Sequence, residues 1–142
     1  MGALELRTRL EKFDIPLKDW TFSARERSGN FSDVTNPEGL NIIDYLELHD
    51  EFYKVGAFIK EIFDKLTTGI ALIALQKNPK ADFGLGGARG LEKARLYLNL
   101  EPGKARIIKA KNWAGEVNPN GLILDFKLVQ GCRFVFDGWK RG

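Results

Sequence analysis

The sequence predicts an α/β domain in which parallel strands with covering helices are followed by an antiparallel meander of strands. Two apolar runs, Leu40 to Asp44 and Ile70 to Leu75, lack alternation, which is typical of strands buried on both faces of a parallel sheet. After residue 94, short strand-like segments are separated by turn residues, which is typical of antiparallel strands. The 142 residues suit one domain with one core that buries roughly two thirds of the surface of the unfolded chain.

Residues 1–39 predict a helix, a short strand and a long loop. Apolar residues recur at helical spacing until Pro16 ends the helix, namely Ala3, Leu6, Leu10 and Phe13. A short strand is expected around Trp20 to Ser23. The polar stretch up to Gly39 is interpreted as a loop.

Residues 40–77 predict a strand, a helix and a second strand. The helix carries an apolar stripe made of Phe52, Val55, Ile59, Ile62, Phe63 and Leu66. Gly69 is placed to begin the second strand. Ligands bind at the carboxyl ends of parallel strands, so we expect Asp44 and Gln76 to lie on the same rim of the sheet.

Residues 78–93 form a glycine-rich basic loop, and residues 94–142 supply the terminal strands. These strands are expected at Arg95 to Leu100, Ala105 to Lys111, Leu122 to Leu128 and Arg133 to Phe136. Pro102-Gly103 and Asn118 to Gly121 are the turns. One predicted strand face is apolar and consists of Leu122, Leu124, Phe126 and Leu128.

Composition and charge exclude several classes of protein. The chain is 44% hydrophobic and 29% charged, as in ordinary globular domains. No apolar run approaches the ~20 residues that cross a bilayer, so we expect no membrane partner and a cytoplasmic location. Cys132 is the single cysteine, and no zinc-like cluster is present. The net charge of +3 permits a nucleic-acid partner without requiring one.

Two polar side chains follow the two predicted buried strands. Asp44 could act chemically, although a strand-end or helix-capping acid is the alternative interpretation. Gln76 follows an apolar strand at a position where packing does not require an amide, so it could also act chemically. The alternative interpretation is that its amide closes a local turn. Glu47 and Asp50 are further acids near this rim, which we interpret as solvated charges or caps.

The glycine-rich loop has two interpretations. Glycine lets backbone amides approach phosphates closely, whereas a flexible linker with incidental charge needs no function. The loop is not a P-loop, because the sequence contains no Gly-Lys-Ser/Thr ending. The candidate DNA contacts in it are Gly86, Gly87, Arg89 and Lys93.

Four cations lie along the second terminal strand and the turn before it, namely Lys104, Arg106, Lys109 and Lys111. An exposed basic edge explains them without a function, because edge lysines discourage unwanted strand pairing. Trp113 follows and either packs in the core or offers a stacking platform to a base, and we favour core packing.

The order of these motifs resembles the RecA-like motor domain of DnaB-type replicative helicases. The resembling segments are LNIIDYLEL (40–48), IALIALQK (70–77), FGLGGARGLEK (83–93) and ARIIKAKNWAGE (105–116). The resemblance covers nearly all of the chain, from just after the first phosphate-binding helix of that domain to near its end. It implies a partial RecA-like P-loop NTPase fold in a single truncated domain.

The resemblance also implies roles for individual residues. Asp44 matches the Walker B acid, which helps to hold the Mg²⁺ ion that bridges the phosphates of ATP. Gln76 matches a glutamine that senses the terminal phosphate. Lys109 and Lys111 lie on a strand whose final lysine, matched by Lys111, reaches a neighbouring subunit's nucleotide. Trp113 stands where that family has an arginine finger.

In that family, the P-loop and the catalytic glutamate precede the segment that matches Met1. We therefore expect a helicase-derived ATPase half-domain, associated with DNA replication, that does not hydrolyse ATP alone. The alternative is a non-catalytic module that binds single-stranded DNA or a protein. We expect the missing N-terminal half of the ATPase domain, or self-association through an open strand edge, to satisfy the unpaired edges of the sheet.

Overall fold

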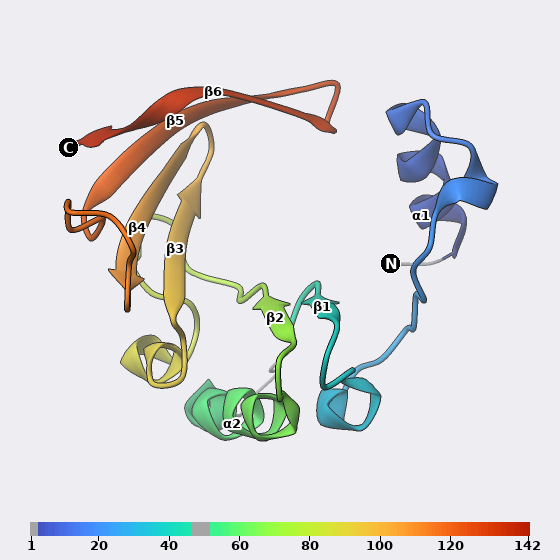
Figure 1. The fold of residues 1–142 in the computed structure, drawn as a ribbon, viewed down its shortest axis with the longest axis horizontal. Helices are drawn as coiled ribbons and strands as arrows, with labels where there is room; N and C mark the ends of the chain where they lie inside the picture. The colour runs from blue at the N-terminus through green and yellow to red at the C-terminus, as the bar shows by residue number, and fades with distance from the viewer. Residues whose placement is uncertain (1–2, 47–51) are drawn as a thin grey trace.

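The computed structural model describes residues 3–46 and 52–142 and contains two separate β-sheets (Figure 1). The first pairs β1 (Leu40–Ile43) with β2 (Ile70–Ile73) in parallel. The second is antiparallel, follows chain order, and consists of β3 (Leu96–Glu101), β4 (Lys104–Ala110), β5 (Leu122–Val129) and β6 (Arg133–Arg141). The prediction of a mixed α/β architecture with parallel strands before an antiparallel meander is confirmed.

Two α-helices, α1 (Ala3–Leu10) and α2 (Val55–Lys65), accompany these sheets. Short 3-10 helices occur at Glu11–Phe13, Leu17–Asp19, Phe31–Val34, Phe52–Lys54 and Gly87–Leu91. Neither α-helix in the described parts of the chain is long and apolar enough to span a membrane.

Helix α2 connects β1 to β2 and covers one face of this pair. Val55 and Ile59 pack with Leu46 in a buried cluster, against which Ile43 and Ile73 of the strands are partly buried. These contacts follow from the apolar stripe of the helix, whose side chains lie on one side at helical spacing. The predicted strand, helix and strand are therefore present.

The opposite face of the β1–β2 pair is uncovered. The register pairs Leu40 with Ile70 and Ile42 with Leu72, so these four side chains share one face, and each is 60% to 69% exposed. The prediction that both strands are buried on both faces is wrong, because no element in the described residues forms a second layer over this face.

The N-terminal segment contains no strand at Trp20 to Ser23, and that prediction is wrong. Aromatic packing takes the place of strand pairing there. The ring of Trp20 contacts Phe13 and Phe22 edge-on, with centroid distances of 5.9 and 5.7 Å. Its indole N–H donates to the carbonyl of Ile15 at 3.3 Å. A strand needs a neighbour to complete its hydrogen bonds, and none lies beside this segment in the described chain.

The chain exposes 10568 Å², whereas a compact monomer of its 16.0 kDa would expose about 7,400 Å². Folding therefore buries roughly half, rather than two thirds, of the surface of the unfolded chain. Two features contribute to this shortfall. Residues 4–30 are exposed at nearly every position, and the β1–β2 pair leaves an apolar face without a covering layer.

Candidate functional site

The first candidate site is the rim at the carboxyl ends of β1 and β2. Asp44 directly follows β1, and Gln76 lies three residues beyond β2. The parallel pairing continues past both strands, because Ala74 N–H donates to Ile43 at 3.0 Å and Leu46 N–H donates to Ala74 at 2.9 Å. The structure thus brings Asp44 and Gln76 to the same end of the pair, and both residues are exposed.

The capacity of this rim to hold a metal is small. No group of three or more His, Cys, Asp or Glu side chains that could hold a metal ion occurs among residues 3–46 and 52–142. Glu47 and Asp50 lie outside the described residues. Asp44 by itself suits Mg²⁺ only where phosphate oxygens supply most of the other ligands.

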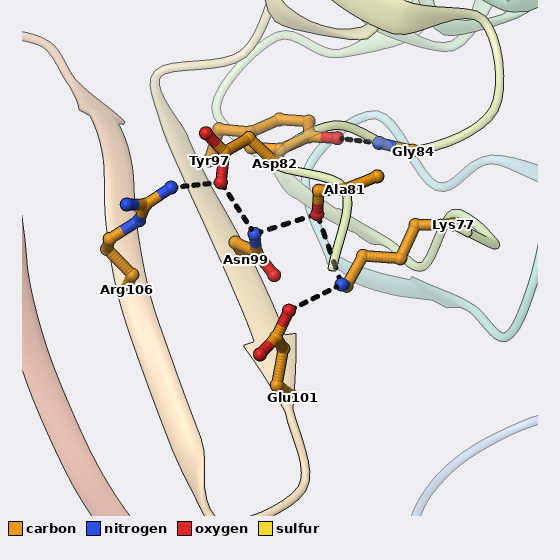
Figure 2. A network of polar contacts seen from close by, with 8 residues as sticks. All are labelled: Lys77, Ala81, Asp82, Gly84, Tyr97, Asn99, Glu101 and Arg106. Atoms are coloured by element: carbon orange, nitrogen blue, oxygen red, sulfur yellow. Dashed lines mark hydrogen bonds and ion pairs between the residues drawn. The ribbon is translucent and has the colours of Figure 1, made fainter. Parts of the chain in front are cut away.

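The glycine-rich loop lies on one face of β3 and β4 and is held there by polar contacts (Figure 2). The backbone N–H of Gly84 donates to the hydroxyl of Tyr97 at 2.8 Å. The amide of Asn99 donates to the carbonyl of Ala81 at 3.0 Å and to the carboxylate of Asp82 at 3.4 Å. These bonds connect the loop to two alternate residues of β3.

Charged pairs extend this network at its two sides (Figure 2). Lys77 donates to the carbonyl of Ala81 at 3.1 Å and pairs with Glu101 of β3 at 3.2 Å. Arg106 of β4 pairs with Asp82 of the loop. Each cation thus has an anion across the interface between the loop and the sheet, so the network stabilises the position of the loop.

A shallow cavity of about 320 Å³ lies beside the network and is lined by Lys80, Asp82, Asn99, Glu101, Lys104, Arg106 and Ile123. Asn99 is buried, and its Oδ1 atom has no hydrogen-bond partner among the described residues. The lining carries three cations and two anions, so the cavity is not a purely cationic site.

The predicted DNA contacts of the loop have structural roles in this fold. Gly86 has a φ of +97°, and a Cβ atom there would lie 2.3 Å from Cγ1 of Val55. Packing against α2 therefore requires glycine at this position. Gly87 has a φ of +63°, but a Cβ atom there would meet nothing within 4 Å.

The two cations of the loop also contact the protein itself. Arg89 donates to the backbone carbonyl of Tyr53 at 2.7 Å. The ammonium of Lys93 lies 5.3 Å from the ring centroid of Phe63 on α2. Both contacts join the loop to α2 and the turn that precedes it, although neither prevents a further contact with solvent or ligand.

Lys109 and Lys111 lie at the end of β4. Lys109 donates to the carbonyl of Leu91. The pKa of Lys109 is lowered, mainly by partial burial and to a lesser extent by the charge of Lys111. Lys111 is exposed, and its backbone N–H donates to Arg95 at 2.8 Å. These lysines belong to the antiparallel sheet, whereas Asp44 and Gln76 belong to the parallel one.

Trp113 is 44% exposed, so the interpretation of Trp113 as a core residue is wrong.

The sequence reasoning missed the polar face of β3. Tyr97, Asn99 and Glu101 alternate with leucines, and this period of two was visible as a strand with one polar face. The positions of Lys77 and Asp82 could not be inferred in the same way, because they contact β3 through a loop whose path depends on the whole fold.

Comparison with known proteins yields no relative. No protein-family model, no curated protein and no solved structure matches this chain.

Proposed function

We propose that this chain is a half-domain of a helicase-derived, RecA-like ATPase that serves DNA replication and is inactive in ATP hydrolysis alone. The observation that supports the proposal is the parallel pairing of β1 with β2, which puts Asp44 and Gln76 at the same carboxyl end. Open α/β sheets bind their ligands at this end of the strands. An exposed acid there could bind the Mg²⁺ that accompanies a nucleotide, and an exposed amide could donate a hydrogen bond to its phosphates.

Open strand edges support the need for a complementary segment. Within the described residues, β2 pairs only with β1, and β3 pairs only with β4. Each of these two strands therefore has one edge whose backbone N–H and C=O groups lack ladder partners among the described residues. A strand from the complementary half could pair with either edge, and another element of that half could form a layer over the exposed face of Leu40, Ile42, Ile70 and Leu72.

The chain's own residues would contribute little of the catalysis. Asp44 would provide a carboxylate ligand to the Mg²⁺ of a bound nucleotide, and the amide of Gln76 could donate a hydrogen bond to the terminal phosphate. Phosphoryl transfer depends mainly on positioning and on stabilisation of negative charge. No Gly-Lys-Ser/Thr segment is present to provide these, so the complementary half has to supply them.

The test is Mg²⁺-dependent ATP hydrolysis by the chain, by a P-loop-bearing segment encoded beside it, and by their mixture. We expect hydrolysis in the mixture only, and its loss when Asp44→Ala replaces the parent chain. Glu38→Ala is the matched control, because Glu38 is an exposed acid before the opposite end of β1. Two results would contradict the proposal. One is ATP hydrolysis by the parent chain alone that Asp44→Ala abolishes, and the other is a mixture that does not hydrolyse ATP.

The single-stranded DNA module remains the second candidate. The cations that would bind DNA in this module are Arg89, Lys93, Lys109 and Lys111, and the first three make contacts within the protein. These contacts account for the cations without DNA, and they favour the half-domain as the first proposal.

A further inference from the structure

One face of the antiparallel sheet is apolar across all four strands, and we call it the apolar face. Strand alternation and the pairing register place its members on the same side. They are Leu96, Leu98, Leu100, Ala105, Ile107, Leu122, Leu124, Phe126, Leu128, Phe134, Phe136 and Trp139. Ring contacts agree with this placement, because Phe134 stacks on Phe126 at a centroid distance of 4.6 Å and lies 5.4 Å from Phe136.

The apolar face is exposed around a buried centre. Ala105, Ile107 and Leu124 are at most 7% exposed, and Leu122 and Phe126 are partly buried. The other leucines and aromatic residues of the face are 39% to 56% exposed, including Phe136 and Trp139. Figure 1 shows the long β5–β6 hairpin that carries much of this surface.

Charges of the sheet are separated from this face. Glu101, Arg106, Asp125, Lys127 and Lys140 alternate with the apolar residues and therefore belong to the opposite side. At the corner of the apolar face, Arg141 donates to the backbone carbonyls of Asn118 and Asn120 at 3.1 and 3.3 Å. A surface without free charge in its centre can meet a copy of itself without repulsion.

The exposed part of the apolar face is made of large side chains, namely Leu96, Leu98, Leu100, Leu128, Phe134, Phe136 and Trp139. The chain exposes about 3,000 Å² more than a compact monomer of its mass, and the apolar face shares this surplus with the β1–β2 surface and the exposed N-terminal segment. Each partner of a standard interface contributes about 800 Å². Large exposed apolar patches on proteins mark interaction sites. The surplus therefore accommodates a face-to-face contact and still leaves the β1–β2 surface available.

We infer that the apolar face is the interface of a homodimer in which two copies pack sheet against sheet. The two sheets would form a sandwich whose inner layers interdigitate about 10 Å apart. A twofold arrangement uses the same patch on both copies, and a patch whose one charge, on Arg141, lies at its corner satisfies that requirement. This interface differs from edge-to-edge association and does not depend on the proposed nucleotide site.

The first test is the mass of the chain by light scattering at micromolar concentration. We expect twice the 16.0 kDa of one chain. Phe136→Lys places a charge among the exposed aromatic residues of the face, beside Phe134, and we expect it to raise the dimer dissociation constant about 100-fold or more. Val135→Lys is the matched control, because Val135 is 45% exposed on the opposite face of the same strand.

The inference is overturned if the parent chain is a monomer, if Phe136→Lys leaves the mass unchanged, or if Val135→Lys dissociates the dimer equally.

A second experiment uses tryptophan fluorescence and needs no charged variant. Trp139 lies on the apolar face, whereas Trp20 and Trp113 lie outside its strands. We expect dilution to shift tryptophan emission to longer wavelength, and Trp139→Phe to remove that shift. A shift that persists in full without Trp139 would also overturn the inference.

Discussion

The backbone N–H of Gly84 donates a hydrogen bond to the hydroxyl of Tyr97 at 2.8 Å, which fixes the middle of the glycine-rich loop on β3 (Figure 2). A tyrosine in this position explains how a loop with four glycines among residues 84–90 keeps one path. The order of the loop results from the strand beside it and not from its own backbone preferences.

Tyr97→Phe should lower the free energy of unfolding by about 1 to 2 kcal/mol, because the Gly84 N–H loses its acceptor while the ring stays in place. Urea denaturation measures this change. Tyr45→Phe is the control, since the hydroxyl of Tyr45 has no hydrogen-bond partner within the described part of the chain. Equal stability of Tyr97→Phe and the parent would show that the bond contributes nothing.

Gly86→Ala should destabilise the protein by about 3 kcal/mol or more. Its backbone has positive φ, and the new Cβ would meet the fully buried Val55 side chain. Gly87→Ala shares the positive φ but has open space, so we expect a loss of only about 1 to 2 kcal/mol. Chemical denaturation of both variants measures the difference. Equal losses would contradict the packing role of Gly86.

The ion pair between Asp125 of β5 and Lys140 of β6 should make stability depend on pH at both extremes. The hydrogen bond from Lys140 lowers the pKa of Asp125 below its usual 3.8, and Asp125 raises the pKa of Lys140 above its usual 10.5. Stability from Asp125 is present above pH 3.8 and is lost as pH falls through its lowered pKa. Stability from Lys140 is present below pH 10.5 and is lost as pH rises through its raised pKa.

Asp125→Asn should therefore reduce stability at neutral pH, and the difference from the parent should disappear in strong acid. Both groups are exposed, so 1 M NaCl should shrink the difference as well. Urea denaturation across pH measures stability, and NMR titration of the Asp125 carboxyl measures its pKa. Lys140→Gln should return that pKa toward 3.8. If Lys140→Gln leaves the pKa of the Asp125 carboxyl unchanged, the pairing is refuted.

The predictable part of the fold consists of elements with local patterns. The stripe that contains Val55, Ile59 and Ile62 identified α2, and turn residues separated the four antiparallel strands. Exposure was not predictable in this way. An apolar run such as Leu40 to Ile43 indicates a strand suited to burial, but its actual burial depends on a second layer that no local pattern reveals.

The candidate site shows the same division. Asp44 and Gln76 reach the same rim because parallel strands align their carboxyl ends, so their proximity along the sheet was predictable. The internal roles of Gly86 and Arg89 were not predictable, because they depend on α2 packing against a loop more than twenty residues away along the chain. Sequence composition alone could not separate a structural glycine from one that approaches a phosphate.

Single-stranded DNA binding, if the chain has it, should be weak and should depend on Lys111 more than on Arg89. Lys111→Glu changes an exposed cation, so we expect weaker binding and a shallower dependence on salt at unchanged stability. Arg89→Glu breaks the hydrogen bond to the Tyr53 carbonyl and should lower the free energy of unfolding by about 1 kcal/mol. Fluorescence anisotropy with a labelled oligonucleotide at several salt concentrations measures binding, and urea denaturation measures stability. If the parent chain binds DNA and Lys111→Glu binds equally well at every salt concentration, Lys111 is not a DNA contact.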